Sequence, residues 1–136
     1  MIRLWDYLRS RERNEMRVWA NEVNLQKRDR AQLNQKLDML HRLGFEMARQ
    51  MHFLAGTSGD HNSIFKLVVH SERMLRPMLC RGPFDMPGEV TLLCGAIEKD
   101  RKLIPPDAAD AAERHRRSVL ESNPPGADKR IDHARF

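Results

Sequence analysis

Three basic side chains in the middle of the chain have the types and spacing to hold a phosphate. Residues 64–70 alternate with a period of two, which predicts a strand carrying Lys66 and His70 on one face, roughly 13 Å apart. If the chain turns at Ser71-Glu72, Arg76 returns beside them on the neighbouring strand, close enough to flank a phosphate with one of them. A guanidinium never loses its charge, so we assign Arg76 to charge stabilisation and Lys66 or His70 to proton transfer.

Further cations lie beside these strands. Arg73 and Arg81 bracket the Arg76 strand, and a basic cluster follows the apolar run at 90–97, formed by Lys99, Arg101 and Lys102. All five suit the backbone of a polyanion. The chain carries a net charge of +5 with a pI near 9.7, which favours polyanionic partners. Most of that excess lies in residues 1–50, as dispersed arginines that a solvated helix face also explains.

The surrounding pattern predicts the elements that position these residues. Apolar residues at helical spacing predict helices over about 12–23 and over 29–44, the second with Asp29 as its N-cap and Gly44 at its end. The short connection between them allows only an antiparallel hairpin. Strands are expected over about 2–5, 64–70, 73–80 and 90–97. Within the strand at 73–80, Pro77 argues against pairing on both sides at that point.

The C-terminal part has a different composition. After a loop at 56–60 and the strands, Pro105-Pro106 stops the sheet and a helix rich in Ala and Arg begins near 107. Its apolar face is thin, so we expect it to dock loosely. Residues 122–136 have no periodicity and are predicted to be disordered. The fold class is therefore α+β, with one domain over 1–121 in which a small antiparallel sheet packs on an N-terminal helical hairpin and carries a C-terminal helix.

Three segments carry a family resemblance in their residues, order and spacing. They are Ile64-Phe65-Lys66-Leu67-Val68-Val69, Leu75-Arg76-Pro77-Met78-Leu79 and Leu92-Leu93-Cys94-Gly95-Ala96-Ile97-Glu98-Lys99, and the last runs through Pro105-Pro106 into the Ala- and Arg-rich helix. Together they resemble the phage-derived, HigB-like branch of the RelE/ParE superfamily of toxin-antitoxin toxins, over roughly residues 30–117. The branch usually has cations where this chain has Val68 and Asp100.

The resemblance implies a RelE-like fold and a type II toxin that acts as an mRNA interferase. Such an endoribonuclease cleaves RNA through the 2′-hydroxyl on the ribosome, without metal or other cofactor, and a helix-turn-helix antitoxin neutralises it. In this chain Arg76, Lys66 and His70 would be catalytic, and Arg73, Arg81, Lys99, Arg101 and Lys102 would contact RNA. Two alternatives stay open because Val68 removes a cation: a toxin of the same fold that inhibits DNA gyrase without cutting nucleic acid, and a phage-derived relative that has lost both activities.

Several other site types are poorly supported by the sequence. Cys80 and Cys94 are too few for a disulfide framework, and Asp6 interrupts the segment where a signal peptide needs its apolar core. We therefore expect a cytoplasmic protein with no membrane partner. The histidines do not fall at zinc-ligand spacing, and the glycines at 56 and 59 lack the Lys of a phosphate-binding loop.

Overall fold

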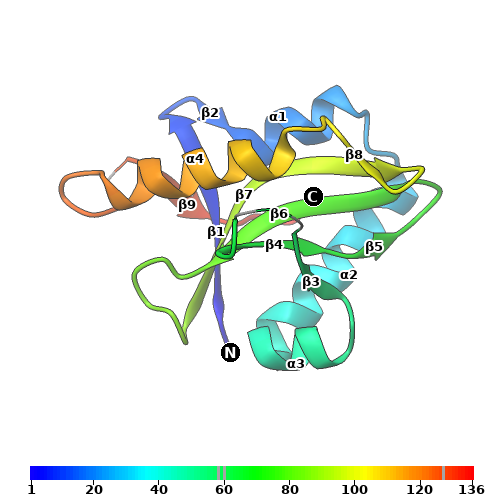
Figure 1. Cartoon of the computed structure of the whole chain (residues 1–136), viewed down its shortest axis with the longest axis horizontal. Helices are drawn as coiled ribbons and strands as arrows, with labels where there is room; N and C mark the ends of the chain where they lie inside the picture. The colour runs from blue at the N-terminus through cyan, green and yellow to red at the C-terminus, as the bar shows by residue number, and fades with distance from the viewer. Residues whose placement is uncertain (58, 60, 127) are drawn as a thin grey trace.

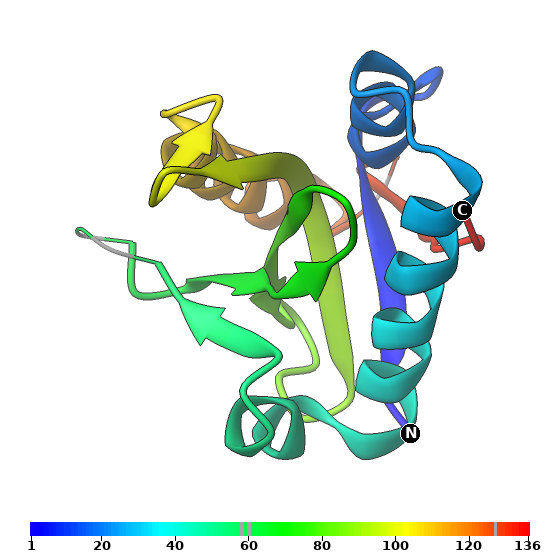
Figure 2. The ribbon, with the colours of Figure 1, turned by 90° about the vertical axis from the view of Figure 1, so that its right-hand side faces the viewer.

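The computed structural model describes residues 1–57, 59, 61–126 and 128–136 and shows an α+β protein built on one twisted sheet. Helix α4 lies on one face of the sheet, whereas α2 and α3 lie on the other with α1 beside them (Figures 1 and 2). Each face has its own hydrophobic core. Leu33, Leu67 and Leu92 belong to the first core, and Ile64, Met78 and Val119 belong to the core beneath α4.

The strand order is β2-β1-β7-β6-β4-β3, with β5 paired to β6, β8 to β7 and β9 to β1. The strands are β1 (Arg3–Ser10), β2 (Arg13–Asn14), β3 (Leu54–Gly56), β4 (Ile64–Leu67), β5 (Val69–His70), β6 (Met74–Arg81), β7 (Glu89–Lys99), β8 (Lys102–Ile104) and β9 (Arg130–Asp132). Pairing of β1 with β7 is parallel. The expected antiparallel sheet is therefore mixed, because the long connection through the helices and β3–β6 returns the chain in the same direction.

Strand β6 is paired with β7 on one side and with β4 and β5 on the other, but at Pro77 it is paired with β7 alone, as expected from the proline. Between β4 and β5 the ladder is interrupted at Val68, and the paired residues of β6 on that side skip Arg76 and Pro77. Proline therefore lies where this ladder needs no backbone donor from it. The predicted turn at residues 71–72 is present, with Ser71 N donating to Arg73 O at 3.1 Å.

The helices are α1 (Glu15–Glu22), α2 (Lys27–Leu43), α3 (Phe45–Gln50) and α4 (Ala108–Leu120). Helix α2 ends at Gly44 as predicted, but it begins before Asp29. Asp29 is the third residue of the helix, and its carboxylate accepts a hydrogen bond from Gln26 N at 3.0 Å. The predicted hairpin is wrong, because α1 packs on β7 and β1 whereas α2 packs on α3 and β5. The indole of Trp19 lies on Gly95 of β7, so the apolar stripe of α1 faces the sheet.

Helix α4 is docked more firmly than its thin apolar face predicts. Ala108, Ala112 and Val119 are at most 1 % exposed, and the helix packs on β6 and β7. Small side chains allow the helix to approach the sheet closely, which compensates for their small area. Across the described residues, no helix combines the length and apolarity needed to cross a membrane.

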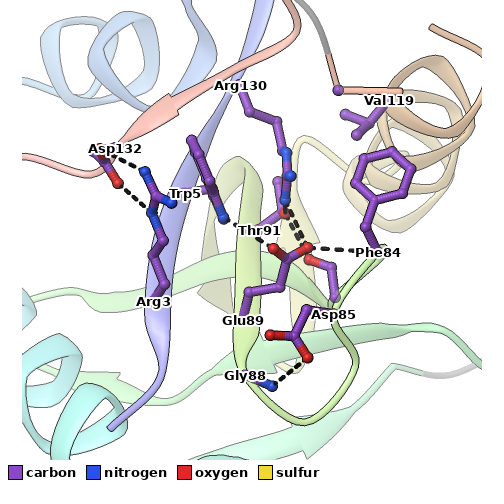
Figure 3. A network of polar contacts seen from close by, with 12 residues as sticks. Arg3, Trp5, Phe84, Asp85, Gly88, Glu89, Thr91, Val119, Arg130 and Asp132 are labelled. Atoms are coloured by element: carbon purple, nitrogen blue, oxygen red, sulfur yellow. Dashed lines mark hydrogen bonds and ion pairs between the residues drawn. The ribbon is translucent and has the colours of Figure 1, made fainter. Parts of the chain in front are cut away.

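The C-terminal segment differs from the predicted disordered tail. Strand β9 pairs with β1, and Arg130 Nη1 donates to Glu89 Oε2 at 2.8 Å from a side chain that is 8 % exposed (Figure 3). Trp5 Nε1 and Phe84 N also donate to the Glu89 carboxylate, at 3.2 and 3.1 Å. These partners lie far from residue 130 in the sequence, so local periodicity carries no signal of them.

Candidate functional site

A pocket of about 640 Å³ lies between the β3–β4 connection, the β7–β8 hairpin and the beginning of α4. Its floor carries Lys66 of β4 and Glu98 of β7, from strands that both flank β6. Of the expected loop at 56–60, residues 58 and 60 lie outside the described residues. The other lining residues are Thr57, Gly59, His61, Arg101, Lys102, Leu103, Pro106, Ala109 and Asp110.

Glu98 binds two of the predicted catalytic cations. Lys66 Nζ lies 3.1 Å from Oε1 of Glu98, and Arg76 Nη2 lies 3.3 Å from Oε2. The sequence interpretation that Lys66 and Arg76 share a face is confirmed, but a carboxylate of this chain lies between them. Glu98 is not among the site residues predicted from the sequence. Along β7 the side chain of Glu98 points away from those of Ile97 and Lys99, so it can lie on the same face of the sheet as Lys66.

The pKa of Glu98 is lowered from its ordinary value. The hydrogen bond from Lys66 has the largest effect, partial burial opposes it, and the charge of Arg76 lowers the pKa further. The carboxylate is therefore ionised at neutral pH, which is the state a general base needs, and the lowered pKa makes it a weaker base than a free glutamate. With two cations around one carboxylate, the floor keeps one positive charge.

Arg76 is buried rather than open to a ligand. Its residue is 5 % exposed, Nη1 donates to Leu75 O at 3.0 Å, and it does not line the pocket. The sequence placed this side chain on an open sheet face, but α4 packs against β6 and β7 there. Arg76 therefore affects the pocket only through its ion pair with Glu98.

The rim of the pocket carries further charged groups. Arg101 and Lys102 line it from the β7–β8 hairpin, whose turn residues Asp100 and Arg101 have φ values of 53° and 64°. That left-handed conformation is uncommon for an arginine. Opposite them, the His61 ring contacts the Asp110 carboxylate through Nε2. A carboxylate orients a histidine in this way in many acid–base sites.

The other predicted site residues lie elsewhere. His70 is exposed beside Met74, and Lys99 is exposed at the end of β7 without lining the pocket. Arg73 donates to Val23 O at 2.6 Å and pairs with Asp29 at 2.9 Å, so it ties the β5–β6 turn to the beginning of α2.

Arg81 lies near α3, where it pairs with Glu46 at 2.9 Å. The structure thus brings together Lys66, Arg76, Arg101 and Lys102, with Lys99 paired to Lys102 across the β7–β8 hairpin, and His70, Arg73 and Arg81 lie apart from them.

The assembled pocket can perform acid–base chemistry on an anionic ligand. It holds an ionised carboxylate, a histidine oriented by a second carboxylate, and cations on its floor and rim. Comparison of the chain with protein-family models, with curated proteins and with solved structures finds no match in any of the three. The interpretation of the site therefore depends on its own geometry and chemistry.

Proposed function

We propose that this pocket binds and cleaves RNA, and that the chain is the endoribonuclease toxin of a type II toxin-antitoxin system, similar to the HigB-like branch of the RelE/ParE superfamily. One observation carries the proposal: Glu98 is ionised on the pocket floor between Lys66 and Arg76, below a cationic rim. A base next to positive charge is the arrangement that phosphodiester cleavage through a 2′-hydroxyl requires.

In the proposed reaction, Glu98 accepts the proton of the 2′-hydroxyl. The resulting oxygen attacks the adjacent phosphorus, the bond from phosphorus to the 5′-oxygen breaks, and a 2′,3′-cyclic phosphate forms. His61 donates a proton to the departing 5′-oxygen, and Asp110 orients the ring. This assignment replaces Lys66 and His70 as the groups that transfer protons.

The cations of the pocket have a separate role in this proposal. Lys66, Arg101 and Lys102 stabilise the negative charge that gathers on the phosphate. Arg76 is a positioning residue, because it touches Glu98 and does not line the pocket. The chain's own residues supply each of these roles without a cofactor.

The proposed partners follow from the same charge. We place the protein in the cytoplasm, on ribosome-bound mRNA, with a helix-turn-helix antitoxin that lays acidic side chains over Arg101 and Lys102. Such an interface would weaken as salt rises, because exposed charges are screened within about 8 Å at physiological ionic strength.

The test compares wild type with Glu98→Gln, using Glu72→Gln on the exposed β5–β6 turn as the matched control. Purified protein is incubated with mRNA, with and without ribosomes, and the new RNA ends are mapped. Loss of the base should lower the cleavage rate about 10²- to 10⁴-fold, whereas Glu72→Gln should cleave like wild type. Circular dichroism is used to check that Glu98→Gln is folded.

Two results would contradict the proposal. The first is a folded Glu98→Gln variant that cleaves at the wild-type rate. The second is intact mRNA together with accumulating DNA breaks after induction in cells, which would favour the gyrase alternative.

A further inference from the structure

A second pocket, of about 300 Å³, lies between α3, the end of β6 and the last turns of α4. Its walls are aromatic and basic. Phe45 and Phe65 pack edge to face with ring centroids 4.9 Å apart, and each ring lies beneath a guanidinium. Arg81 is 4.8 Å from the Phe45 centroid, and Arg49 is 5.3 Å from that of Phe65.

We propose that this second pocket holds one base of the RNA strand whose phosphate lies at Glu98. The inference rests on the proposed function and adds a binding subsite to it. Protein sites for single-stranded RNA stack the bases on aromatic rings and on arginine planes. Phe45 is buried, so the surface open to a base here is the exposed Arg49 guanidinium, which lies over the half-buried Phe65.

The charge of the second pocket suits a nucleotide rather than a neutral ligand. Arg81 is paired with Glu46, and the third arginine of the lining, Arg116, is paired with Glu113. Arg49 is exposed and forms no ion pair within the described part of the chain. Its guanidinium is therefore available both to stack with a base and to attract the RNA backbone.

Consecutive residues of the chain line the two pockets. His61 lines the first, and the next two residues, Asn62 and Ser63, are exposed and line the second. Helix α4 also borders both, through Asp110 at one pocket and Arg116 at the other, about 9 Å apart along the helix axis. The two pockets therefore share one loop and one helix in their walls. Asn62 and Ser63 supply the donors and acceptors that read a base edge.

The experiment isolates the base from the rest of the RNA. The probes are fluorescein-labelled 2′-O-methyl oligonucleotides of six residues, one series for each base, which cannot be cleaved because the nucleophilic hydroxyl is blocked. In each series a single abasic residue is moved along the strand. Dissociation constants are measured by fluorescence anisotropy for wild type, Arg49→Ala and the control Arg42→Ala, which removes an exposed arginine outside the pocket.

We expect one abasic position to weaken binding to wild type and to Arg42→Ala about tenfold, which corresponds to about 1.4 kcal/mol of stacking. In Arg49→Ala the same change should weaken binding less than threefold, because the stacking surface is already lost. Phe65→Leu, which keeps an apolar side chain, should behave like Arg49→Ala.

The outcomes separate the two proposals. If wild type binds the intact and abasic probes equally well while still cleaving RNA through Glu98, the base subsite is wrong and the proposed function stands. If the abasic penalty is the same in Arg49→Ala and Phe65→Leu as in wild type, the second pocket is not where the base binds. Failure of wild type to bind any of the probes would overturn the base subsite, whereas the Glu98→Gln cleavage assay with ribosomes decides the proposed function separately.

Discussion

Arg130→Met tests whether the C-terminal segment is part of the folded body. Arg130 and Glu89 have side chains that are 8 % and 9 % exposed, and the guanidinium also lies 4.3 Å from the ring centroid of Trp5. Methionine keeps most of the stem that packs there but removes the charge. Glu89 then stays buried without its guanidinium partner, beside uncharged donors such as those of Trp5 and Phe84.

The expected loss follows from the burial of the pair. Removing one partner of a buried ion pair destabilises a protein by about 3–5 kcal/mol, because the other charge stays unpaired. For a chain of 136 residues the unfolding entropy is about 0.29 kcal/mol/K, so the loss lowers Tm by about 10 to 17 °C. A loss of this size is a large share of the total stability of an ordinary domain.

The assay is thermal and urea unfolding followed by circular dichroism. Arg11→Met is the matched control, since Arg11 also pairs with an acid of the C-terminal segment, Asp128, but the two side chains are 81 % and 65 % exposed. It should change stability by at most about 0.5 kcal/mol. Adding Glu89→Gln to Arg130→Met should recover part of the loss by removing the unpaired charge. The reasoning fails if Arg130→Met costs no more than Arg11→Met, or if the double variant recovers nothing.

Three other expectations concern single sites. Gly95→Ala should destabilise the fold by at least about 2 kcal/mol in urea unfolding, because the new Cβ would lie 1.9 Å from the Trp19 ring. A Gly95→Ala variant as stable as wild type would contradict that contact. Burial raises the pKa of Glu89, but the bonds from Arg130 and Phe84 outweigh it, so the net pKa is below 4.5. The stability it contributes is therefore complete above that unfolded value and lost as the pH falls through the folded pKa, and Glu89→Gln should flatten stability against acid pH. Because Lys66 lowers the pKa of Glu98, Lys66→Met should move the acid limb of RNA cleavage to higher pH; an unchanged limb would argue against Glu98 as the base.

The parts of the fold that the sequence predicts are those encoded by local patterns. The alternation at 64–70 identifies strands β4 and β5, Gly44 marks the end of α2, and the apolar run at 90–97 lies within β7. Together with the predicted turn at residues 71–72, this alternation places Lys66 and Arg76 on one face, as the structure has them.

The parts that the sequence does not predict depend on pairing between distant residues. Glu98 and Lys66 contact each other across β6, since β7 and β4 flank that strand. Periodicity does not reveal strand order, so the sequence gives no sign of this contact. The parallel pairing of β1 with β7 and the contact of Arg130 with Glu89 are of the same kind. Burial of Arg76 was missed because a face covered by a helix and an open face give the same alternation.

The position of β1 inside the sheet has a consequence for how the molecule is made. This strand is synthesised before the other strands of the sheet, yet apart from the adjacent β2 its partners are residues 89–92 of β7 and 130–132 of β9. At about 5–20 residues per second, a ribosome reaches β9 about 6 to 24 s after it has finished β1. Until then residues 5–7 of β1 lack their β9 neighbour, and pairing over such sequence separations is slow. If the proposed function holds, the sheet that supports the cleavage pocket is completed only after the ribosome has translated β9.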